Sequence, residues 1–579
     1  MSATTAGTPA AAARPAARAE QRRLPSWWPL AALVLLAAVL RLATLTEQSF
    51  WYDESFTPVH VLHAGLGATL KAVVHSENTP PLWYLLAWLD VRLLGDGALA
   101  LRLPSALAGI ATVPVVWAIG KALSGRRAAL IGAAIVAVNP LFVWYSQEAR
   151  AYGLFVFFAA LAMLCFVRLL REPTGARAAW FALSGALALL THYFAVFPLV
   201  PMVLLLLRER ATRRAALPAA GALLVVGLAL LPLISAQGAH GTQWIGRWAL
   251  SSRLQAIPQY FLTGYSGSPL GHGVELLVAL PLLAGVALGA WRLFGSASAA
   301  EAGRPGASVP EGAPRTGTAR APAASAREGA RIALAIAAFG VLAPIVLAVF
   351  GADYLAPRNL VAAMIPVSVL LAILLAAIDG SDTPDLPEAP AAPDARSGQA
   401  PGAPRRAASG ATTSPRTSSL PIGALLAALV LVAFSIVSLD VDASPRLQRG
   451  NWRDLAKLLG REDRPRAITT VELGAAPLEY YLPRPRLHNL ARHASANVSE
   501  IDETGYAPLR HGAGRPPAAG FRLLERREID GLIVYRFVSS VPRTVPEAAL
   551  RRNVITLAHP EVLVPATDGS RSQTPPKTG

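Results

Sequence analysis

The feature that most constrains this chain is a series of apolar runs, each about twenty residues long. The first extends from Trp27 to Leu45 and the last from Ile422 to Leu439. A helix of this length crosses the hydrocarbon core of a bilayer. Only 15% of the 579 residues are charged, whereas soluble domains carry about a quarter. The sequence therefore predicts an all-α polytopic membrane protein and excludes a cytosolic enzyme, a fibrous protein and an ordinary secreted protein.

Short arginine-rich stretches between the apolar runs predict the topology, because cytoplasmic loops carry an excess of Lys and Arg. If all of them lie inside, the parity of the crossings requires about eleven spans, with the N-terminus inside and the C-terminal region outside. The run Ala178–Leu207 must then divide near His192 into two spans. Pro80–Leu94 must lie on the outer surface as an amphipathic helix. The other spans are predicted at Ala98–Gly120, Ala128–Tyr145, Tyr152–Val167, Leu217–Ala236, Val274–Leu293, Ile332–Phe350 and Leu360–Ile378.

Composition divides the first part of the chain into regions. Residues 1–26 form a basic cytoplasmic segment, and residues 27–440 form the transmembrane domain. Within that domain, residues 46–97 make one large outer loop. Residues 295–329 and 379–419 are rich in Ala, Pro, Gly and Arg. They contain too few large apolar residues to bury a core, so we expect two disordered cytoplasmic loops.

The C-terminal region has a different pattern. Residues 452–459 have the periodicity of a helix, and residues 467–471 and 531–537 have the composition of strands. We therefore expect a small extracytoplasmic α/β domain over residues 441–565. Residues 566–579 are expected to form a disordered tail.

The net charge of +17 does not indicate nucleic-acid binding, because the arginines are spread over loops and the outer domain. The single cysteine, Cys165, excludes an internal disulfide. The sequence has no CxxC or P-loop motif, and its scattered histidines are poor evidence for a metal site, so no metal site or nucleotide site is predicted. The abundance of Ala, Gly, Pro and Arg suggests a bacterial genome rich in G and C.

Candidate site residues gather first in the large outer loop. Asp53 and Glu54 come just after the first span, where carboxylates at a bilayer surface are costly unless solvated or used. The alternative is that Asp53 caps a short helix and Glu54 faces water. His75 and Glu77 precede a double proline and are weaker candidates, and Lys71 lies nearby.

Further candidates follow at the outer ends of later spans. Glu148 and Arg150 stand among aromatic residues that include Tyr152, although the two charges could simply neutralise each other. Arg358, four residues after Tyr354, could hold a lipid phosphate, or could snorkel to lipid headgroups in general. The pair His192 and Tyr193 marks an outer turn with the mixture of rings and hydrogen-bonding groups that suits a sugar.

Together these clusters resemble the membrane glycosyltransferases of the GT-C fold. The most similar group contains the bacterial relatives of protein O-mannosyltransferases and the ArnT-like aminoarabinose transferases, described as dolichyl-phosphate-mannose-protein mannosyltransferase-like. The resemblance runs from about Trp27 to Tyr193 and continues weakly through Tyr354–Arg358 and Asn451-Trp452-Arg453. The motifs that carry it are Asp53-Glu54, Thr79-Pro80-Pro81-Leu82, Arg102-Leu103-Pro104-Ser105 and Ser146-Gln147-Glu148-Ala149-Arg150-Ala151-Tyr152.

The resemblance implies that a sugar, mannose or another hexose, moves from a polyprenyl-phosphate carrier to an acceptor hydroxyl with inversion at the anomeric carbon. Asp53 corresponds to the family's general base. Glu54 and Glu148 are the other catalytic candidates, and Glu148 would orient acceptor or sugar. Arginines would stabilise the leaving phosphate. The substrate-binding candidates are Arg150, Tyr152, Arg358, Lys71, His75, Glu77, His192, Tyr193 and Tyr354.

The same resemblance predicts the partners and the location. The donor is a polyprenyl-phosphate sugar, and the acceptor is a protein, a glycolipid or a cell-wall polymer of the cell envelope. No soluble cofactor is required; the fold accommodates a divalent metal, which two isolated carboxylates do not demand. The location is the bacterial plasma membrane, among membrane lipids. The alternative function is a transporter or flippase for lipid-linked sugars without covalent transfer, and a third is a scaffold whose outer domain binds a partner.

Overall fold

The computed structural model describes residues 25–238, 245–265, 272–295, 322–380, 421–460, 463–482, 487–507, 509, 514–552, 555 and 560–565. The predictions for the N-terminal segment, for most of the two cytoplasmic loops and for the tail lie outside these residues. The structure does describe one part of the first predicted cytoplasmic loop. Residues 322–329, predicted as loop, are helical, because this stretch is rich in the good helix formers Ala, Arg and Glu.

Helices make up most of the described chain. In the first half they are α1 (Trp28–Leu42), α2 (Tyr52–Phe56), η1 (Thr57–Val61), α3 (Leu66–Ser76), α4 (Leu82–Leu94), α5 (Ala98–Leu123), α6 (Arg126–Val138), α7 (Pro140–Ser146), α8 (Tyr152–Arg171), α9 (Gly175–Thr191), η2 (Tyr193–Ala195), α10 (Val196–Arg208) and α11 (Arg210–Gly238). They continue as η3 (Ile245–Arg247), α12 (Leu250–Thr263), α13 (His272–Ala290), η4 (Trp291–Gly295), α15 (Pro322–Val349), η5 (Pro357–Ala363), α16 (Met364–Ile378), α17 (Ile422–Ala443) and η6 (Pro445–Leu447).

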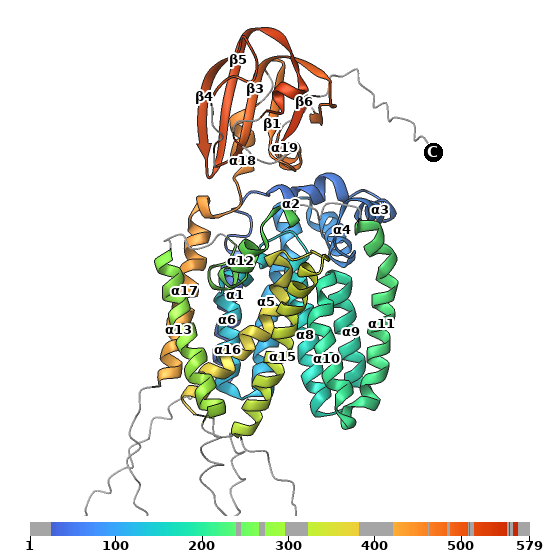
Figure 1. The fold of residues 1–579 in the computed structure, drawn as a ribbon, viewed down its shortest axis with the longest axis vertical. Helices are drawn as coiled ribbons and strands as arrows, with labels where there is room; N and C mark the ends of the chain where they lie inside the picture. The colour runs from blue at the N-terminus through green and yellow to red at the C-terminus, as the bar shows by residue number, and fades with distance from the viewer. Residues whose placement is uncertain are drawn as a thin grey trace, which may run out of the picture.

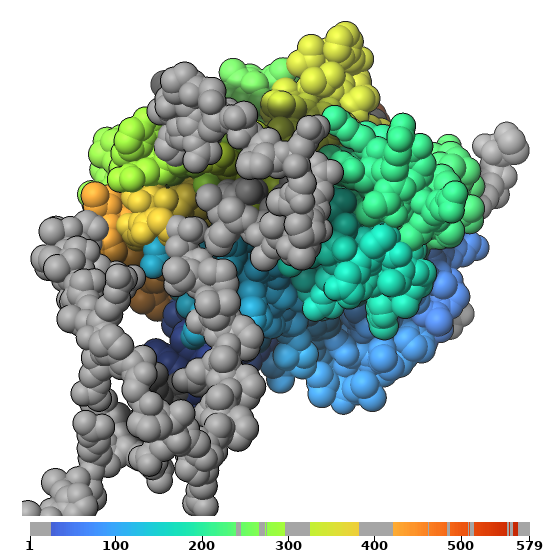
Figure 2. All heavy atoms as spheres, turned by 90° about the horizontal axis from the view of Figure 1, so that it is seen from below, coloured from blue at the N-terminus to red at the C-terminus, as the bar shows by residue number. Residues whose placement is uncertain are grey.

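The long apolar helices stand side by side below a sheet domain, and α2, α3 and α4 lie between the two (Figure 1). Seen from the end opposite the sheet, α9, α10 and α11 gather on one side of the bundle, and α13, α16 and α17 on the other (Figure 2). Helices α5, α6 and α8 pack between these groups. The bundle therefore presents its loop helices and the sheet domain at the same end.

The helices confirm a multi-pass membrane protein. Within the described residues, seven helices are long and apolar enough to cross a membrane, and the bent pair α6–α7 makes an eighth. Three shorter apolar helices, Trp28–Leu42, Gly175–Thr191 and Tyr193–Arg208, lie where the sequence predicts further spans. The predicted division near His192 is confirmed, because α9 ends at Thr191 and the chain turns there. The total of about eleven spans stays a prediction.

The predicted span Ala128–Tyr145 is not straight but bends by 55° between α6 and α7. Pro140 has no backbone N–H and keeps Asn139 extended, so α6 ends there. The Asn139 side chain accepts a hydrogen bond from Leu141 N and so caps α7. The freed carbonyls at the end of α6 also find donors. Arg41 donates to Val136 O and Ala137 O, and Ser438 donates to Val138 O.

The outer loop between α1 and α5 is built from short helices. α4 begins directly after Pro80-Pro81, as expected from the fixed backbone of proline, and ends at Gly95 with φ +84°. One face of α4 buries Trp83, Tyr84 and Ala87, and the opposite face leaves Leu93 exposed. These contacts agree with the amphipathic surface helix predicted for this segment.

The C-terminal region contains a six-stranded sheet in the order β2-β6-β1-β3-β5-β4. Its strands are β1 (Arg466–Thr470), β2 (Leu487–Asn489), β3 (Ser495–Tyr506), β4 (Arg522–Ile529), β5 (Leu532–Pro546) and β6 (Glu561–Pro565). Only β1 and β3 pair in parallel. Helices α18 (Trp452–Leu459) and α19 (Ala475–Tyr481) pack on one face of the sheet, and α20 (Glu547–Leu550) follows β5. The predicted helix and both predicted strands are present, although β5 is nine residues longer than expected at its C-terminal end because it pairs with β3 along its length.

Candidate active site

The two adjacent carboxylates of α2 face different surroundings, because neighbouring helix positions point about 100° apart. The Asp53 side chain is 16% exposed, and its Oδ2 lies 2.7 Å from Nη1 of Arg358. The Glu54 side chain is fully buried. Asp53 is therefore the carboxylate of this pair that a substrate can reach.

Glu54 is held by a dense set of donors. Its Oε2 lies 2.7 Å from Nη2 of Arg102, and its Oε1 accepts from Nε of Arg102 and from Ala149 N, both at 2.8 Å. Although burial raises the pKa of Glu54, the charges of Arg102 and Arg449 outweigh that effect and hold the pKa below its ordinary value. Arg102 also donates to three backbone carbonyls, those of Leu45, Gln48 and Ser49. This geometry favours an anchoring role for Glu54 over the catalytic role that the sequence predicts.

Glu148 lies in the turn between α7 and α8, 1% exposed. Among the residues that the structure describes, its Oε2 has no hydrogen-bond partner. Nη2 of Arg449 lies 3.6 Å from that oxygen. Burial raises the pKa of Glu148 to about 7, even though the charge of Arg449 lowers it. A buried carboxyl group with a free oxygen beside Asp53 and Arg358 is suited to bind a hydroxyl group.

Arg150 does not neutralise Glu148 but pairs with Glu77. Its Nη2 lies 3.1 Å from Oε2 of Glu77, and Nη1 donates to the carbonyl of Asp53 at 3.4 Å. The hydroxyl of Tyr84 donates to the same Glu77 oxygen at 2.6 Å. The ion pair of two predicted residues, Arg150 and Glu77, thus joins the loop after α7 to the outer loop. Arg150 also holds α2 through the carbonyl of Asp53.

Aromatic rings surround these charges. Tyr152 lies 4.9 Å from Tyr145 and 5.7 Å from His192, measured between ring centroids. His192 stacks on Phe155, and its Nδ1 accepts from the N–H of Phe194. Burial lowers the pKa of His192 to about 3, so the imidazole is neutral. Tyr152 and His192 therefore line the site as uncharged groups.

Four other predicted residues lie apart from the carboxylates. Tyr193 donates to Gln237 at 2.7 Å and so ties η2 to the end of α11. Lys71 and His75 are exposed on α3, and Tyr354 is 46% exposed. In the described part of the chain, no hydrogen bond or ion pair joins Lys71, His75 or Tyr354 to Asp53 or Glu148.

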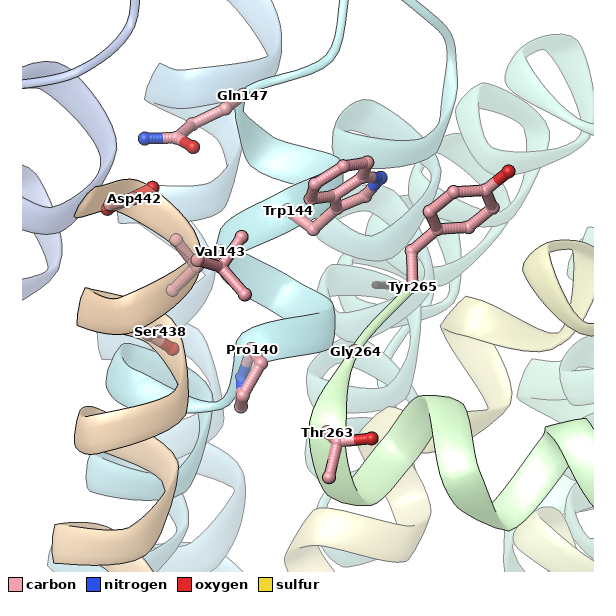
Figure 3. A pocket seen from close by; sticks show the side chains of 10 residues that line it. Pro140, Val143, Trp144, Gln147, Thr263, Gly264, Tyr265, Ser438 and Asp442 are labelled. Atoms are coloured by element: carbon pink, nitrogen blue, oxygen red, sulfur yellow. The ribbon is translucent and has the colours of Figure 1, made fainter. Parts of the chain in front are cut away.

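Sequence reasoning gave no role to Arg102 or Arg449, although both contact the buried carboxylates. Arg102 had a usable signal, because an arginine near the end of an apolar span is rare unless it is paired. Arg449 had none, because it lies in a polar link far along the chain. Its guanidinium covers the ring of Trp144 at 4.1 Å, and that ring stacks on Tyr265 at 5.2 Å. Figure 3 shows Trp144 and Tyr265 beside one another at the edge of a pocket that also includes Gln147 and Pro140.

A metal site is not apparent in the described ranges. No group of three or more His, Cys, Asp or Glu side chains there is arranged to hold a metal ion. Asp53 and the carboxylates around it lie against arginines instead.

Comparison with known proteins confirms the resemblance that the motifs indicate. The family model described as dolichyl-phosphate-mannose-protein mannosyltransferase matches residues 78–236. The YkcB protein of Bacillus subtilis (strain 168), named as a candidate mannosyltransferase, is 25% identical over 150 residues, which is 24% of this chain and 21% of that protein. The match thus spans about a fifth of the length of that relative.

Solved structures of similar proteins were also found. ArnT from Cupriavidus metallidurans bound to undecaprenyl phosphate aligns with 88% of this chain and 98% of its own, at 13% identity and a TM-score of 0.44. The Pmt1-Pmt2 protein O-mannosyltransferase complex of S. cerevisiae bound to the sugar donor aligns with 36% of this chain and 33% of that chain, at 19% identity and a TM-score of 0.30.

Proposed function

We propose that this protein is an inverting glycosyltransferase that transfers a sugar, mannose or another hexose, from a polyprenyl-phosphate carrier to an acceptor hydroxyl. The reaction takes place at the outer face of a bacterial plasma membrane. The family match over residues 78–236 supports this activity. The observation that carries the proposal is the pair of Asp53 and Arg358, a base and a cation 2.7 Å apart at the end of the bundle next to the loop helices.

The pair supplies both groups that the reaction needs. The donor phosphate competes with Asp53 for Arg358, because guanidinium binds phosphate and carboxylate in the same way. Asp53 is then free to take the proton of the acceptor hydroxyl while that oxygen forms a bond to the anomeric carbon. The bond between the anomeric carbon and the phosphate oxygen breaks on the opposite face. Polyprenyl phosphate leaves, and Arg358 stabilises its charge.

The surrounding residues would position the sugar. Glu148, with its free oxygen, would accept a hydrogen bond from a sugar or acceptor hydroxyl. Tyr152 and neutral His192 would form the wall of the sugar site. The acceptor is a protein, a glycolipid or a cell-wall polymer, and the outer sheet domain lies on the same side as the site.

The test is transfer from radiolabelled polyprenyl-phosphate mannose, and from other lipid-linked sugars, by purified protein in liposomes. Wild type should release or transfer sugar. In Asp53→Asn the rate of transfer should be at least about 100-fold lower, while the protein keeps its fold. Asp96→Asn, the same change at an exposed position of the same loop, is the matched control. Full activity of Asp53→Asn would remove the base assignment. Movement of lipid-linked sugar across the bilayer without any transfer would favour the flippase.

A further inference from the structure

Arg449 lies in the link between η6 and α18, where the chain passes from the last long helix to the sheet domain. The surrounding positions of this link are polar and partly exposed, yet the Arg449 side chain is 1% exposed. It points into the end of the helical bundle rather than toward the sheet, because its partners are Gln48, Trp144, Glu54 and Glu148. A linker residue thus forms part of the wall of the site.

The contacts of Arg449 join three segments that meet at the site. Nη1 donates to Oε1 of Gln48 at 2.8 Å, and Nη2 donates to Trp144 O at 3.2 Å. Nε lies 3.5 Å from Oε2 of Glu54, and Nη2 lies 3.6 Å from Oε2 of Glu148. The same guanidinium covers the ring of Trp144.

Each of the other three carboxylates around the site has an arginine nitrogen within 3.1 Å. Arg358 pairs with Asp53, Arg102 binds Glu54 through two hydrogen bonds, and Arg150 pairs with Glu77. Glu148 instead has Nη2 of Arg449 at 3.6 Å, without a hydrogen bond to its Oε2. A buried carboxylate needs such a partner to stay ionised.

We propose that Arg449 is a positioning residue of the transfer site, which holds Glu148 in place and supplies its counter-charge, so that docking of the outer domain completes the site. This inference rests on the proposed function only in taking the site to be the place of sugar transfer. The ionisation of Glu148 itself can be measured without any sugar transfer.

Several other groups also act on Glu148 and belong in the test. They are Asp53 and Glu54 on α2, Arg358 on η5, Tyr145 on α7 and Tyr152 on α8. The two carboxylates disfavour ionisation of Glu148, and Arg358 favours it. Replacement of Arg449 alone leaves all of these groups in place, so the change in titration reports on Arg449.

The first measurement is infrared spectroscopy of the purified full chain in lipid, as a function of pH. The carbonyl band of protonated Glu148 is identified as the band that Glu148→Gln removes. Its wild-type midpoint is expected near 7, because burial raises the pKa of this group. Arg449→Gln should raise the midpoint by about one pH unit or more, since an opposite charge at this distance lowers a carboxyl pKa by about one to three. Arg446→Gln removes an exposed arginine of the preceding helix η6 and should leave the midpoint unchanged.

The second measurement is the pH profile of transfer. In this proposal the ionised form of Glu148 is the active one. At pH 7, Arg449→Gln should therefore reduce kcat about fivefold if the midpoint rises from 7 to 8, and about tenfold for each further unit, with recovery toward wild type at higher pH. A merely structural defect would not recover. If Arg449→Gln does not fold, Arg449→Met fills a similar volume without the charge and carries the same expectation, and Arg449→Lys should bring the midpoint back toward wild type.

An unchanged midpoint in Arg449→Gln or Arg449→Met would overturn the proposal. A loss of transfer that does not recover at high pH would overturn it as well. If wild type transfers no sugar from any lipid carrier, the proposed function fails, whereas the infrared midpoints still decide whether Arg449 controls Glu148.

Discussion

Asp53 and Glu54 are adjacent carboxylates with different surroundings. The same change from carboxylate to amide should therefore affect mainly activity at Asp53 and mainly stability at Glu54. Glu54→Gln removes the negative charge that faces buried Arg102 and Arg449. It also turns an amide NH₂ toward donors, because both Glu54 oxygens accept hydrogen bonds. Breaking a buried ion pair by removal of one partner destabilises a protein by about 3–5 kcal/mol.

Asp53→Asn should behave differently. Asp53 and Arg358 are 16% and 22% exposed, and water can replace part of their interaction. We expect a loss of about 1 kcal/mol, the typical contribution of one hydrogen bond. Asp53→Asn should therefore be folded and inactive, whereas Glu54→Gln should be unstable.

The assay is the fraction of monodisperse protein that survives heating in detergent, followed by size-exclusion chromatography. Unfolding of a membrane protein of this size is irreversible under such conditions, so the apparent melting temperature is compared between variants at one heating rate. Glu54→Gln should melt clearly below Asp53→Asn and wild type. If Glu54→Gln is as stable as wild type but inactive, Glu54 acts in catalysis and the anchoring role assigned to it is incorrect.

Three further predictions concern the same region. Burial raises the pKa of Glu148 from 4.5 to about 7, so the folded state binds more protons than the unfolded state between these pH values. The contribution of Glu148 to the free energy of unfolding should therefore fall by about 3 kcal/mol as the pH rises through that window, and level off above it. Glu148→Gln should remove this contribution, so its melting temperature should fall less than that of wild type between pH 5 and pH 8. Arg358→Gln should reduce transfer by about 100-fold through lost stabilisation of the leaving phosphate, measured with the radiolabelled donor, and unchanged rates would refute its role. Tyr481→Phe removes the hydroxyl that accepts from Phe50 N at 2.8 Å, so backbone exchange around Phe50 should speed up by about fivefold in a hydrogen-exchange experiment, equivalent to about 1 kcal/mol, and an unchanged rate would show that this bond does not hold the loop.

The transmembrane part of the fold could be predicted because apolar length and arginine placement are local features of the sequence. The bend in α6–α7 could have been predicted from Asn139-Pro140, which was hidden within an otherwise continuous apolar run. Strand β3 could not be predicted, because Glu500, Asp502 and Glu503 interrupt its apolar pattern. Asp502 is buried only because Arg536 of the paired strand β5 donates to it at 2.8 Å.

For the candidate site too, local sequence features could be predicted and contacts between distant segments could not. Asp53, Glu148 and Arg358 lie in short polar stretches at the ends of apolar runs, so the sequence indicated them, and the structure places them together. The pairing of charges could not be predicted, because each partner is distant in sequence. Arg449 is about 300 residues from Glu148 and about 400 from Glu54.

The bend between α6 and α7 also bears on how the protein is made. Arg41, the donor for Val136 O and Ala137 O, is synthesised before them and is available as soon as α6 enters the membrane. Ser438, the donor for Val138 O, is 300 residues further along the chain. During that interval the carbonyl of Val138 must bind water or lipid headgroups, because hydrocarbon offers no donor. The hydrogen bond that satisfies the carbonyl of Val138 can therefore form only after the last long helix, α17, has been synthesised.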